Sequence, residues 1–421
     1  MSDKIQSVPG MSDLLPAHSS LWQVIEQMAR QHFAVYGFSE IRVPLLEDTK
    51  LFARGIGEAT QVVSKEMYTF TDRGGDSITL RPEGTAGVVR AYVQHSLHAQ
   101  EPINKVYYLG PMFRYERPQK GRLRQFHQIG AETFGANSPT SDAEMIILVD
   151  RLVKRLGIDS YQLQINSLGS HEERKPFMEK LTQLLLGFKN QLCADCHKRL
   201  EKNPLRVFDC KNASCQALTK NAPTLLEVLG PESKQHFEAV CCQLETAGVA
   251  FVINPRIVRG LDYYEQTAFE FISDKLGSQS AFAGGGRYNR LVEELGGEPT
   301  SAVGFAIGME RLVMLVDANR ETNPLFTQKN RGVFLASFDE ADRIIARQLV
   351  QVLRDAGIRA EADFEPKSIK SQMRRANKQG FRFVAVIGEN ERLSQTVALK
   401  DLESGMQTSV AQRELVEKVK L

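Results

Sequence analysis

The sequence lacks a long apolar run, an apolar N-terminal segment and an excess of charge of one sign. No stretch approaches the roughly eighteen consecutive apolar residues of a membrane-spanning helix. No apolar run follows a basic start, as it does in a secretory signal. We therefore expect a cytoplasmic protein with no membrane segment, whose six cysteines form no structural disulfides. The net charge of +2 gives no general attraction to nucleic acid, so any RNA-binding surface must be a local patch.

The chain of 421 residues is long enough for two or three domains with a substantial core. Its hydrophobic content of 42% and charged content of 25% are typical of a globular protein. A polar stretch that contains Asn323-Pro324 predicts a linker. We predict a first domain over residues 1–322, a linker over 323–330 and a second domain over 331–421.

A predicted hairpin within the first domain carries several arginines. Residues 105–115 and 124–134 read as strands, and the connector is too short for a crossover helix, so the two arms should pair antiparallel. Arg114 closes the first arm and Arg122 lies in the loop. Guanidinium groups suit phosphate because they present several donors in a fixed fork.

The second arm of the hairpin presents three informative side chains on one face. Phe126, Gln128 and Glu132 share the same parity along the strand, so they should point to one side of the sheet. An aromatic ring can stack on a base there, beside a polar amide and carboxylate. From the residues alone, two interpretations stay open: a ligand-binding face, or an exposed basic hairpin.

Two other segments carry residues suited to a polar ligand. Pro82 and Glu83 suit the first turn of a helix, where Glu83 either caps the helix or binds an ammonium group of a ligand. Tyr263 and Tyr264 either recognise a polar ring by stacking and hydrogen bonding or are simply two aromatic residues of a strand.

Two glycine-containing segments could approach a ligand closely. We expect Gly284-Gly285-Gly286 to form the turn that ends a strand, which would let the backbone come near a ligand. Residues 300–316 predict a strand that runs into a helix. Arg311 at the start of that helix marks either a phosphate site or a surface ion pair with Glu310.

A helical, charged segment at about residues 171–235 looks like an insertion, and it contains four cysteines. Cys193 and Cys196 form a CxxC pair, and Cys210 and Cys215 form a CxxxxC pair after a gap of thirteen residues. The four thiolates could hold zinc tetrahedrally, or they could be reduced, partly buried thiols. Cys241-Cys242 lie on a later predicted helix and read as core.

The second domain alternates strands and helices, which predicts a mixed or parallel sheet. A basic helix over residues 367–379 is its most distinctive element. It has no acidic residue among its five cations, and it is either a solvated face or an RNA contact. These cations are Lys367, Lys370, Arg374, Arg375 and Lys378.

Three motifs resemble those of class II aminoacyl-tRNA synthetases. Phe113-Arg114-Tyr115-Glu116 resembles the FRxE core of motif 2, and Gly308 with Arg311 resembles motif 3. The predicted helix near Leu21–Phe33, the strand Ser39–Leu46 and Pro44 are similar to motif 1. The run Arg259-Gly260-Leu261-Asp262-Tyr263-Tyr264 resembles the signature of the histidyl-tRNA synthetase family, of the bacterial type, and the similarity extends along nearly the whole chain.

The resemblance implies an α+β fold: a class II catalytic domain with an antiparallel sheet flanked by helices, plus a C-terminal α/β domain that binds the anticodon. It implies catalytic roles for Arg114, Arg259 and Arg311. The implied histidine-binding residues are Glu83, Thr85, Gln128, Glu132, Tyr263 and Tyr264. The implied ATP-binding residues are Arg114, Glu116, Arg122, Phe126 and Arg311.

The implied reaction joins L-histidine to tRNA(His) through a histidyl-adenylate, with release of AMP and diphosphate. ATP would be used with Mg²⁺, held largely by the nucleotide because no acidic metal cage is evident in the sequence. The resemblance also implies a homodimer formed through motif 1. Two positions depart from the family pattern: Glu265 stands where many relatives have Asn, and Asn289 where many have Asp. We expect Glu265 to be peripheral.

Two alternatives to this ligase are weighed. One is a catalytically silent relative that serves as the regulatory subunit of a histidine-biosynthetic phosphoribosyltransferase. Such relatives usually lack the anticodon domain and the arginine and tyrosine signatures, which this chain keeps. The other is a synthetase for another amino acid, against which the run from Arg259 to Tyr264 argues.

Overall fold

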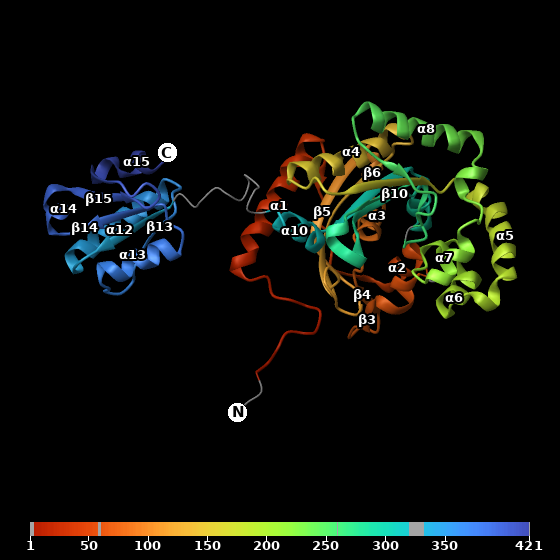
Figure 1. Cartoon of the computed structure of the whole chain (residues 1–421), viewed down its shortest axis with the longest axis horizontal. Coiled ribbons are helices and arrows are strands. Elements are labelled where there is room, and N and C mark those ends of the chain that lie inside the picture. The colour runs from red at the N-terminus through yellow and green to blue at the C-terminus, as the bar shows by residue number, and fades with distance from the viewer. Residues whose placement is uncertain (1–3, 58–59, 259, 320–331, 421) are drawn as a thin grey trace. The chain divides into compact units, whose positions relative to one another are not determined.

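The computed structural model describes residues 4–57, 60–258, 260–319 and 332–420 (Figure 1). The chain divides into two compact units, residues 1–319 and 320–421. The boundary lies three residues before the predicted end of the first domain. The predicted linker at 323–330 and Arg259 lie outside the described residues. Within the described residues, no helix has the length and apolar character that a membrane crossing requires.

The first unit is built on an eight-stranded sheet, seen at the centre of that unit in Figure 1. Its inner strands, from β5 to β7 across the sheet, all pair antiparallel, and the short β1 and β8 join the two edges in parallel. This confirms the predicted antiparallel sheet. In spatial order the strands are β1 (Ser39–Glu40), β5 (Asn104–Phe113), β6 (Gln125–Phe134), β11 (Ala302–Gly308), β10 (Ala281–Arg287), β9 (Glu265–Ile272), β7 (Gln162–Ser167) and β8 (Val252–Ile253).

Helices flank this sheet because each has one apolar stripe to bury. In α1 the buried residues recur at helical spacing, for example at Leu21, Ile25 and Phe33, and Phe33 stacks on Tyr107 of β5 with ring centroids 4.5 Å apart. α1 contacts α4 and α10, which pack on the sheet. These helices are α1 (Pro16–Val35), α4 (Pro139–Arg155) and α10 (Met309–Asp317).

A second group of helices and a small sheet complete the unit near the start of α3. Here α2, α3 and α9 contact one another, and β2, β4 and β3 form a three-stranded antiparallel sheet. The elements are α2 (Thr49–Ile56), η1 (Val62–Glu66), α3 (Thr85–Gln94), η2 (Leu97–Ala99), α9 (Leu291–Glu294), β2 (Leu46–Asp48), β3 (Tyr68–Thr71) and β4 (Ser77–Leu80). Elsewhere in the unit, η6 (Asp274–Gln279) follows β9 and contacts α10.

The hairpin of β5 and β6 forms as predicted, with arms that begin or end within two residues of the predicted bounds. The ring of Tyr108 lies between two glycines of neighbouring segments. A Cβ added to Gly84 or to Gly130 would lie 2.2 Å from that ring, so both positions require glycine. The tyrosine thereby ties the N-terminus of α3 to the middle of β6.

Two local predictions were wrong. The single strand predicted over 39–46 is only two residues long as β1, because the chain leaves the sheet before Pro44, which has no N–H to donate. The three glycines predicted as a turn lie inside β10. A Cβ on Gly285 would lie 2.1 Å from the carbonyl oxygen of Gly304, so the close approach serves strand packing.

The insertion is a helical cluster at one end of the first unit, where α5, α6 and α7 lie together (Figure 1). It begins at a capping box in which Ser170 accepts from the N–H of Glu173, and Glu173 accepts from the N–H of Ser170. Cys241 is half-buried and Cys242 is exposed on α8, so the prediction that both are core was wrong. The elements are α5 (His171–Gly187), η3 (Lys189–Gln191), α6 (Ala194–Lys202), η4 (Pro204–Asp209), α7 (Ala213–Thr219), η5 (Leu225–Val228) and α8 (Pro231–Thr246).

The second unit has a mixed sheet, one of the two forms predicted. β13, β12 and β14 are parallel, and β15 and β16 are antiparallel neighbours. The strand β16 near the C-terminus was not predicted from the sequence. The elements are β12 (Val333–Ser337), α12 (Glu340–Asp355), β13 (Ala360–Ala362), α13 (Ile369–Lys378), β14 (Phe383–Ile387), α14 (Glu389–Ser394), β15 (Thr396–Asp401), β16 (Gln407–Ala411), η7 (Gln412–Glu414) and α15 (Leu415–Val419).

Candidate active site

A cavity of ≈ 290 Å³ opens on the first unit, and most of the predicted site residues line it. They come from the N-terminus of α3, the β5–β6 hairpin, the segment before β9 and the start of α10. The lining residues that the sequence singled out are Glu83, Thr85, Arg114, Glu116, Arg122, Phe126, Gln128, Tyr263, Tyr264 and Arg311. The topology therefore gathers four separate chain segments into one site.

The cavity arginines are held in place by the protein itself. Arg114 donates from Nε to the carbonyl of Pro82 (2.8 Å), and its guanidinium carbon lies 5.2 Å from the centre of the Phe126 ring. Arg311 donates to the carbonyls of Gly121 (3.0 Å) and Ala281. Burial, helped by a neighbouring arginine, lowers the pKa of Arg311, although a guanidinium stays charged at neutral pH. These cations are therefore oriented before any ligand arrives.

A carboxylate pairs with a third arginine in the same wall. Nε of Arg122 lies 2.5 Å from Oε2 of Glu116. The pair links the hairpin loop to the end of β5, where both residues face the cavity. An anionic ligand can compete with Glu116 for the guanidinium, which makes this pair suited to exchange of partners.

Glu83 caps α3 and also lines the cavity, so its capping role does not remove it from the site. Its carboxylate accepts from the backbone N–H groups of Thr85 (2.7 Å) and Ala86 (2.8 Å). Only 3% of the residue is exposed. Burial raises the pKa of Glu83, and the two N–H groups oppose that rise. An ammonium group in the cavity would favour its charged form.

Glu132 lies behind the cavity wall and not in it. It is fully buried, and it accepts hydrogen bonds from the hydroxyls of Thr85 (2.7 Å) and Tyr288. Burial is the main reason that the pKa of Glu132 is raised to about 8. The carboxyl group thus positions the hydroxyl of Thr85 on α3 and that of Tyr288, which directly follows β10. Strand parity alone could not reveal this role.

The pocket end that holds the tyrosines contains buried polar atoms that form no well-aligned hydrogen bond with the described residues. Among the described residues, neither Oε1 of Gln128 nor the hydroxyl of Tyr263 has a well-formed hydrogen bond, although both atoms are buried. The rings of Tyr263 and Tyr264 have centroids 4.6 Å apart, and Tyr288 packs edge-on to Tyr263 at 5.5 Å. An aromatic wall with unsatisfied polar atoms fits a small polar ring.

The sequence reading missed four residues of this site. Tyr108 and Tyr288 support the pocket from behind, and Glu270 and Glu310 line the cavity. Glu310 accepts from the backbone N–H of His127 at 2.9 Å, so it joins α10 to β6 and is not a surface partner of Arg311. Tyr288 follows the glycine strand directly in the sequence, but only the order β6-β11-β10 brings it to Glu132.

The two positions that depart from the family pattern contact each other. Glu265 accepts from the backbone N–H of Asn289 (3.2 Å), and Asn289 accepts from Arg287 (3.1 Å). Glu265 does not line the cavity, so it is peripheral to the site, although it is buried and not on the surface. Glu265 therefore places a carboxylate beside Asn289, the position at which many relatives have Asp.

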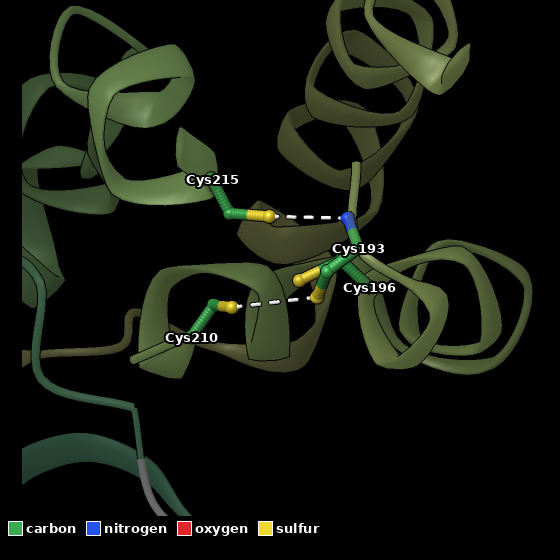
Figure 2. A group of neighbouring side chains, drawn as sticks. All are labelled: Cys193, Cys196, Cys210 and Cys215. Carbon is green, nitrogen blue, oxygen red and sulfur yellow. Dashed lines mark hydrogen bonds between the residues drawn. The ribbon is translucent and has the colours of Figure 1, made fainter. Parts of the chain in front are cut away.

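The four cysteines of the insertion converge on one point (Figure 2). Their sulfur atoms all lie within 4.8 Å of one another, and the sulfurs of Cys193 and Cys210 are 3.7 Å apart. The backbone N–H of Cys193 donates to the sulfur of Cys215 at 3.3 Å. None of the four forms a disulfide. A tetrahedral zinc ion with Zn–S bonds of about 2.3 Å requires S···S separations of about 3.8 Å, which this cluster nearly provides.

The five cations predicted on the basic helix of the second unit do not all lie on one exposed helix face. Lys367 precedes α13, and Arg375 pairs with Asp363 and Glu361 of its own unit. The remaining three cations are exposed and lie four residues apart, on one stripe of the helix. This stripe, which we call the α13 stripe, is Lys370, Arg374 and Lys378.

Comparisons with known proteins agree with this architecture. A family profile described as Histidyl-tRNA synthetase matches residues 10–173 and 187–312, and one described as Anticodon binding domain matches residues 333–421. A Histidine--tRNA ligase from Trichlorobacter lovleyi is 49% identical over 96% of both chains, and one from Anaeromyxobacter sp. is 48% identical over 99% of both. The crystal structure of apo S. aureus histidyl-tRNA synthetase matches with a TM-score of 0.83 and 35% identity, covering 99% of this chain and 100% of that one. The chain belongs to the histidyl-tRNA synthetase family.

Proposed function

We propose that the chain joins L-histidine to tRNA(His) in two steps, with ATP as the source of energy. In the first step a carboxylate oxygen of histidine attacks the α-phosphorus of ATP. The bond from that phosphorus to the oxygen bridging to the β-phosphate breaks, giving histidyl-adenylate and diphosphate. In the second step a hydroxyl of the terminal ribose of tRNA attacks the acyl carbon, and AMP leaves.

The observation that carries this proposal is the single cavity that unites a polyanion site with a polar aromatic pocket. Both reactants of the first step are anions, so their approach needs fixed positive charge. Arg114 supplies it from the hairpin and Arg311 from α10, and we propose Arg259 as a third cation. Phe126 offers a face for adenine beside Arg114, and Glu116 an acceptor for its amino group.

The pocket end of the cavity fits histidine by its pattern of donors and acceptors. Glu83 and Thr85 lie where a buried carboxylate and a hydroxyl can hold an α-ammonium group. Gln128 and Tyr263 have unsatisfied polar atoms that an imidazole can satisfy. An analogue without the ring nitrogens would leave these atoms unpaired, and sites of this kind reject such analogues strongly.

We propose Mg²⁺ and zinc as the two metals of the protein. Glu270 and Glu310 line the cavity, and one or two carboxylates with the phosphates of ATP are what Mg²⁺ usually requires. Magnesium there would neutralise phosphate charge. The four cysteines have the ligand type and spacing of a closed structural zinc site.

The remaining parts of the proposal concern assembly and place. We propose a homodimer that pairs through α1 and β1, where Val35 leaves 81% of its surface exposed at the end of α1. We propose that the α13 stripe contacts the anticodon arm of tRNA, because three cations on one face attract phosphate. The six free cysteines fit a reducing, cytoplasmic compartment.

The test is aminoacylation with radiolabelled histidine and a set of purified tRNAs. We expect label on tRNA(His) alone, and release of one AMP for each histidine attached. Absence of labelled tRNA(His), in a preparation that binds both ATP and histidine, would contradict the proposed ligase.

A further inference from the structure

We propose that the insertion is a zinc-stapled clamp, which positions residues 256–258 and 260–264 and through them the tyrosines of the histidine pocket. The clamp is the helical cluster of α5, α6, η4 and α7. This inference rests on the proposed function only in assigning the pocket to histidine. The zinc site and the contacts of the clamp stand independently of that assignment.

The clamp grips the segment through side chains that lie between the two cysteine pairs. Asn203 donates to Oδ1 of Asp262 at 3.0 Å. Arg206 donates to the same oxygen at 3.3 Å and also to the carbonyl of Gly260. Both residues lie between Cys196 and Cys210, so their placement depends on how that stretch is fixed.

The segment in turn reaches back into the clamp. Arg256 donates to the carbonyls of Lys220 (3.0 Å) and Ala222 (2.8 Å), just beyond α7, and its guanidinium carbon lies 4.5 Å from the centre of the Phe208 ring. From α5, Arg174 donates to the carbonyl of Tyr264 at 2.7 Å. The segment is therefore held at both of its ends by the same insertion.

The clamp would gain from a cross-link because two of its helices are short. α6 has nine residues and α7 has seven, and helices of that length are marginal without added stabilisation. Cys193 is the residue before α6, Cys210 follows η4, and Cys215 lies on α7, so one ion would join all three elements. Zinc bound by thiolates contributes its binding free energy directly to folding.

The consequence for the pocket follows from adjacency along the chain. Asp262 directly precedes Tyr263 and Tyr264, which line the cavity. If the clamp loosens, the tyrosines lose their fixed position, while Arg114 and Arg311 keep their own contacts on the hairpin and on α10. Loss of zinc should therefore raise the KM for histidine more than the KM for ATP.

The first test measures metal in the full-length protein, purified under reducing conditions. Mass spectrometry of the desalted protein should find about one zinc per chain. The double variant Cys196→Ser/Cys210→Ser should lose it and unfold at a lower temperature, whereas Cys242→Ser, which changes an exposed cysteine outside the cluster, should keep both properties. A wild-type protein that neither contains nor takes up zinc would overturn the proposal.

The second test separates the clamp from the metal. Arg206→Ala leaves the four cysteines intact, so it should retain zinc, and it should raise the KM for histidine in pyrophosphate exchange about tenfold, the scale of changes in supporting contacts of a site. Lys202→Ala removes an exposed cation from the same insertion and should change that KM less than about twofold. Full zinc content with an unchanged histidine KM in Arg206→Ala would overturn the clamp.

Two measurements protect these tests from ambiguity. If the cysteine variant does not fold, a chelator can strip zinc from the wild-type protein, and return of the histidine KM on adding zinc supports the proposal. Failure of that KM to change on stripping contradicts it. If the protein does not activate histidine at all, the proposed function fails, but zinc content and thermal unfolding still report on the staple.

Discussion

Among the described residues, basic side chains gather in the cavity and on α13, and these two clusters differ in what holds their side chains. Arg114 and Arg311 donate to backbone carbonyls and are oriented without a ligand. The α13 stripe consists of exposed cations on one helix face. Fixed donors suit a transition state, where charge develops at one place, and exposed cations suit the extended phosphate backbone of an RNA. Counts of charge in the sequence do not distinguish these two uses.

Removing a held cavity arginine should have the largest effect. For Arg311→Ala we expect kcat/KM in histidine-dependent pyrophosphate exchange to fall by about 10²–10³, the range for loss of one preorganised donor. Arg311→Lys should recover little, since an ammonium group lacks the fork that donates to both Gly121 and Ala281. Arg73→Ala, at an exposed turn, is the matched control. A loss of less than about tenfold in Arg311→Ala would remove the distinction between the two clusters.

Neutralising the α13 stripe should affect tRNA and not the amino acid. We expect Lys370→Ala/Arg374→Ala/Lys378→Ala to lower kcat/KM for tRNA charging about thirtyfold at moderate salt. The slope of log K for tRNA binding against log salt concentration should fall by the equivalent of up to about three phosphate contacts. Pyrophosphate exchange should stay within about twofold of the wild-type rate. The triple variant Arg413→Ala/Lys418→Ala/Lys420→Ala changes the same charge elsewhere in the unit. Equal losses in both triple variants would show that net charge, and not the stripe, matters.

Burial of the cavity network should make stability depend on pH. The pKa of Glu132 is raised from its ordinary 4.5 to about 8, so between these values the folded protein binds a proton that the unfolded chain does not. The free energy of unfolding should fall as pH rises through this window and level off above about 8. We expect the wild-type protein to lose about 2 kcal/mol relative to Glu132→Gln between about pH 6 and pH 7.5, by about 1.4 kcal/mol per unit. Parallel curves for the two proteins in urea unfolding would contradict this explanation.

Arg375 lies on the same helix as the stripe, but its ion pairs should give it a role in stability and not in tRNA binding. Its side chain is 31% exposed and pairs with Asp363, of which only 4% is exposed. Arg375→Ala should destabilise the second unit by about 1 kcal/mol in urea unfolding of the full chain, because a nearly buried carboxylate loses its partner. Its tRNA charging should stay within about twofold. A loss of tRNA charging well beyond twofold, with an unchanged free energy of unfolding, would show that Arg375 acts with the stripe.

Local pattern was enough to predict the hairpin, the strand into α10 and the alternation of strands and helices in the second unit, because their periodicity and connector lengths are encoded nearby in the chain. It left open whether the sheet of the second unit is mixed or parallel. It was not enough for β10, where glycine is required because the backbone of the neighbouring strand β11 approaches closely. It also did not predict that β1 is short. The site residues that were missed, Tyr108 and Tyr288, act through segments brought together only by the order of strands. Glu132 was found by parity, but its burial behind Thr85 depends on α3 and β10.

The clearest test of the central claim is amino-acid-dependent exchange of radiolabelled pyrophosphate into ATP, with the twenty amino acids supplied one at a time. We predict exchange with histidine alone, because only a ring with matching donors and acceptors offsets the desolvation of the polar atoms of Gln128 and Tyr263. Exchange with another amino acid would contradict the assignment of the pocket. No exchange with any of them, in a protein that still binds histidine, would contradict the ligase itself.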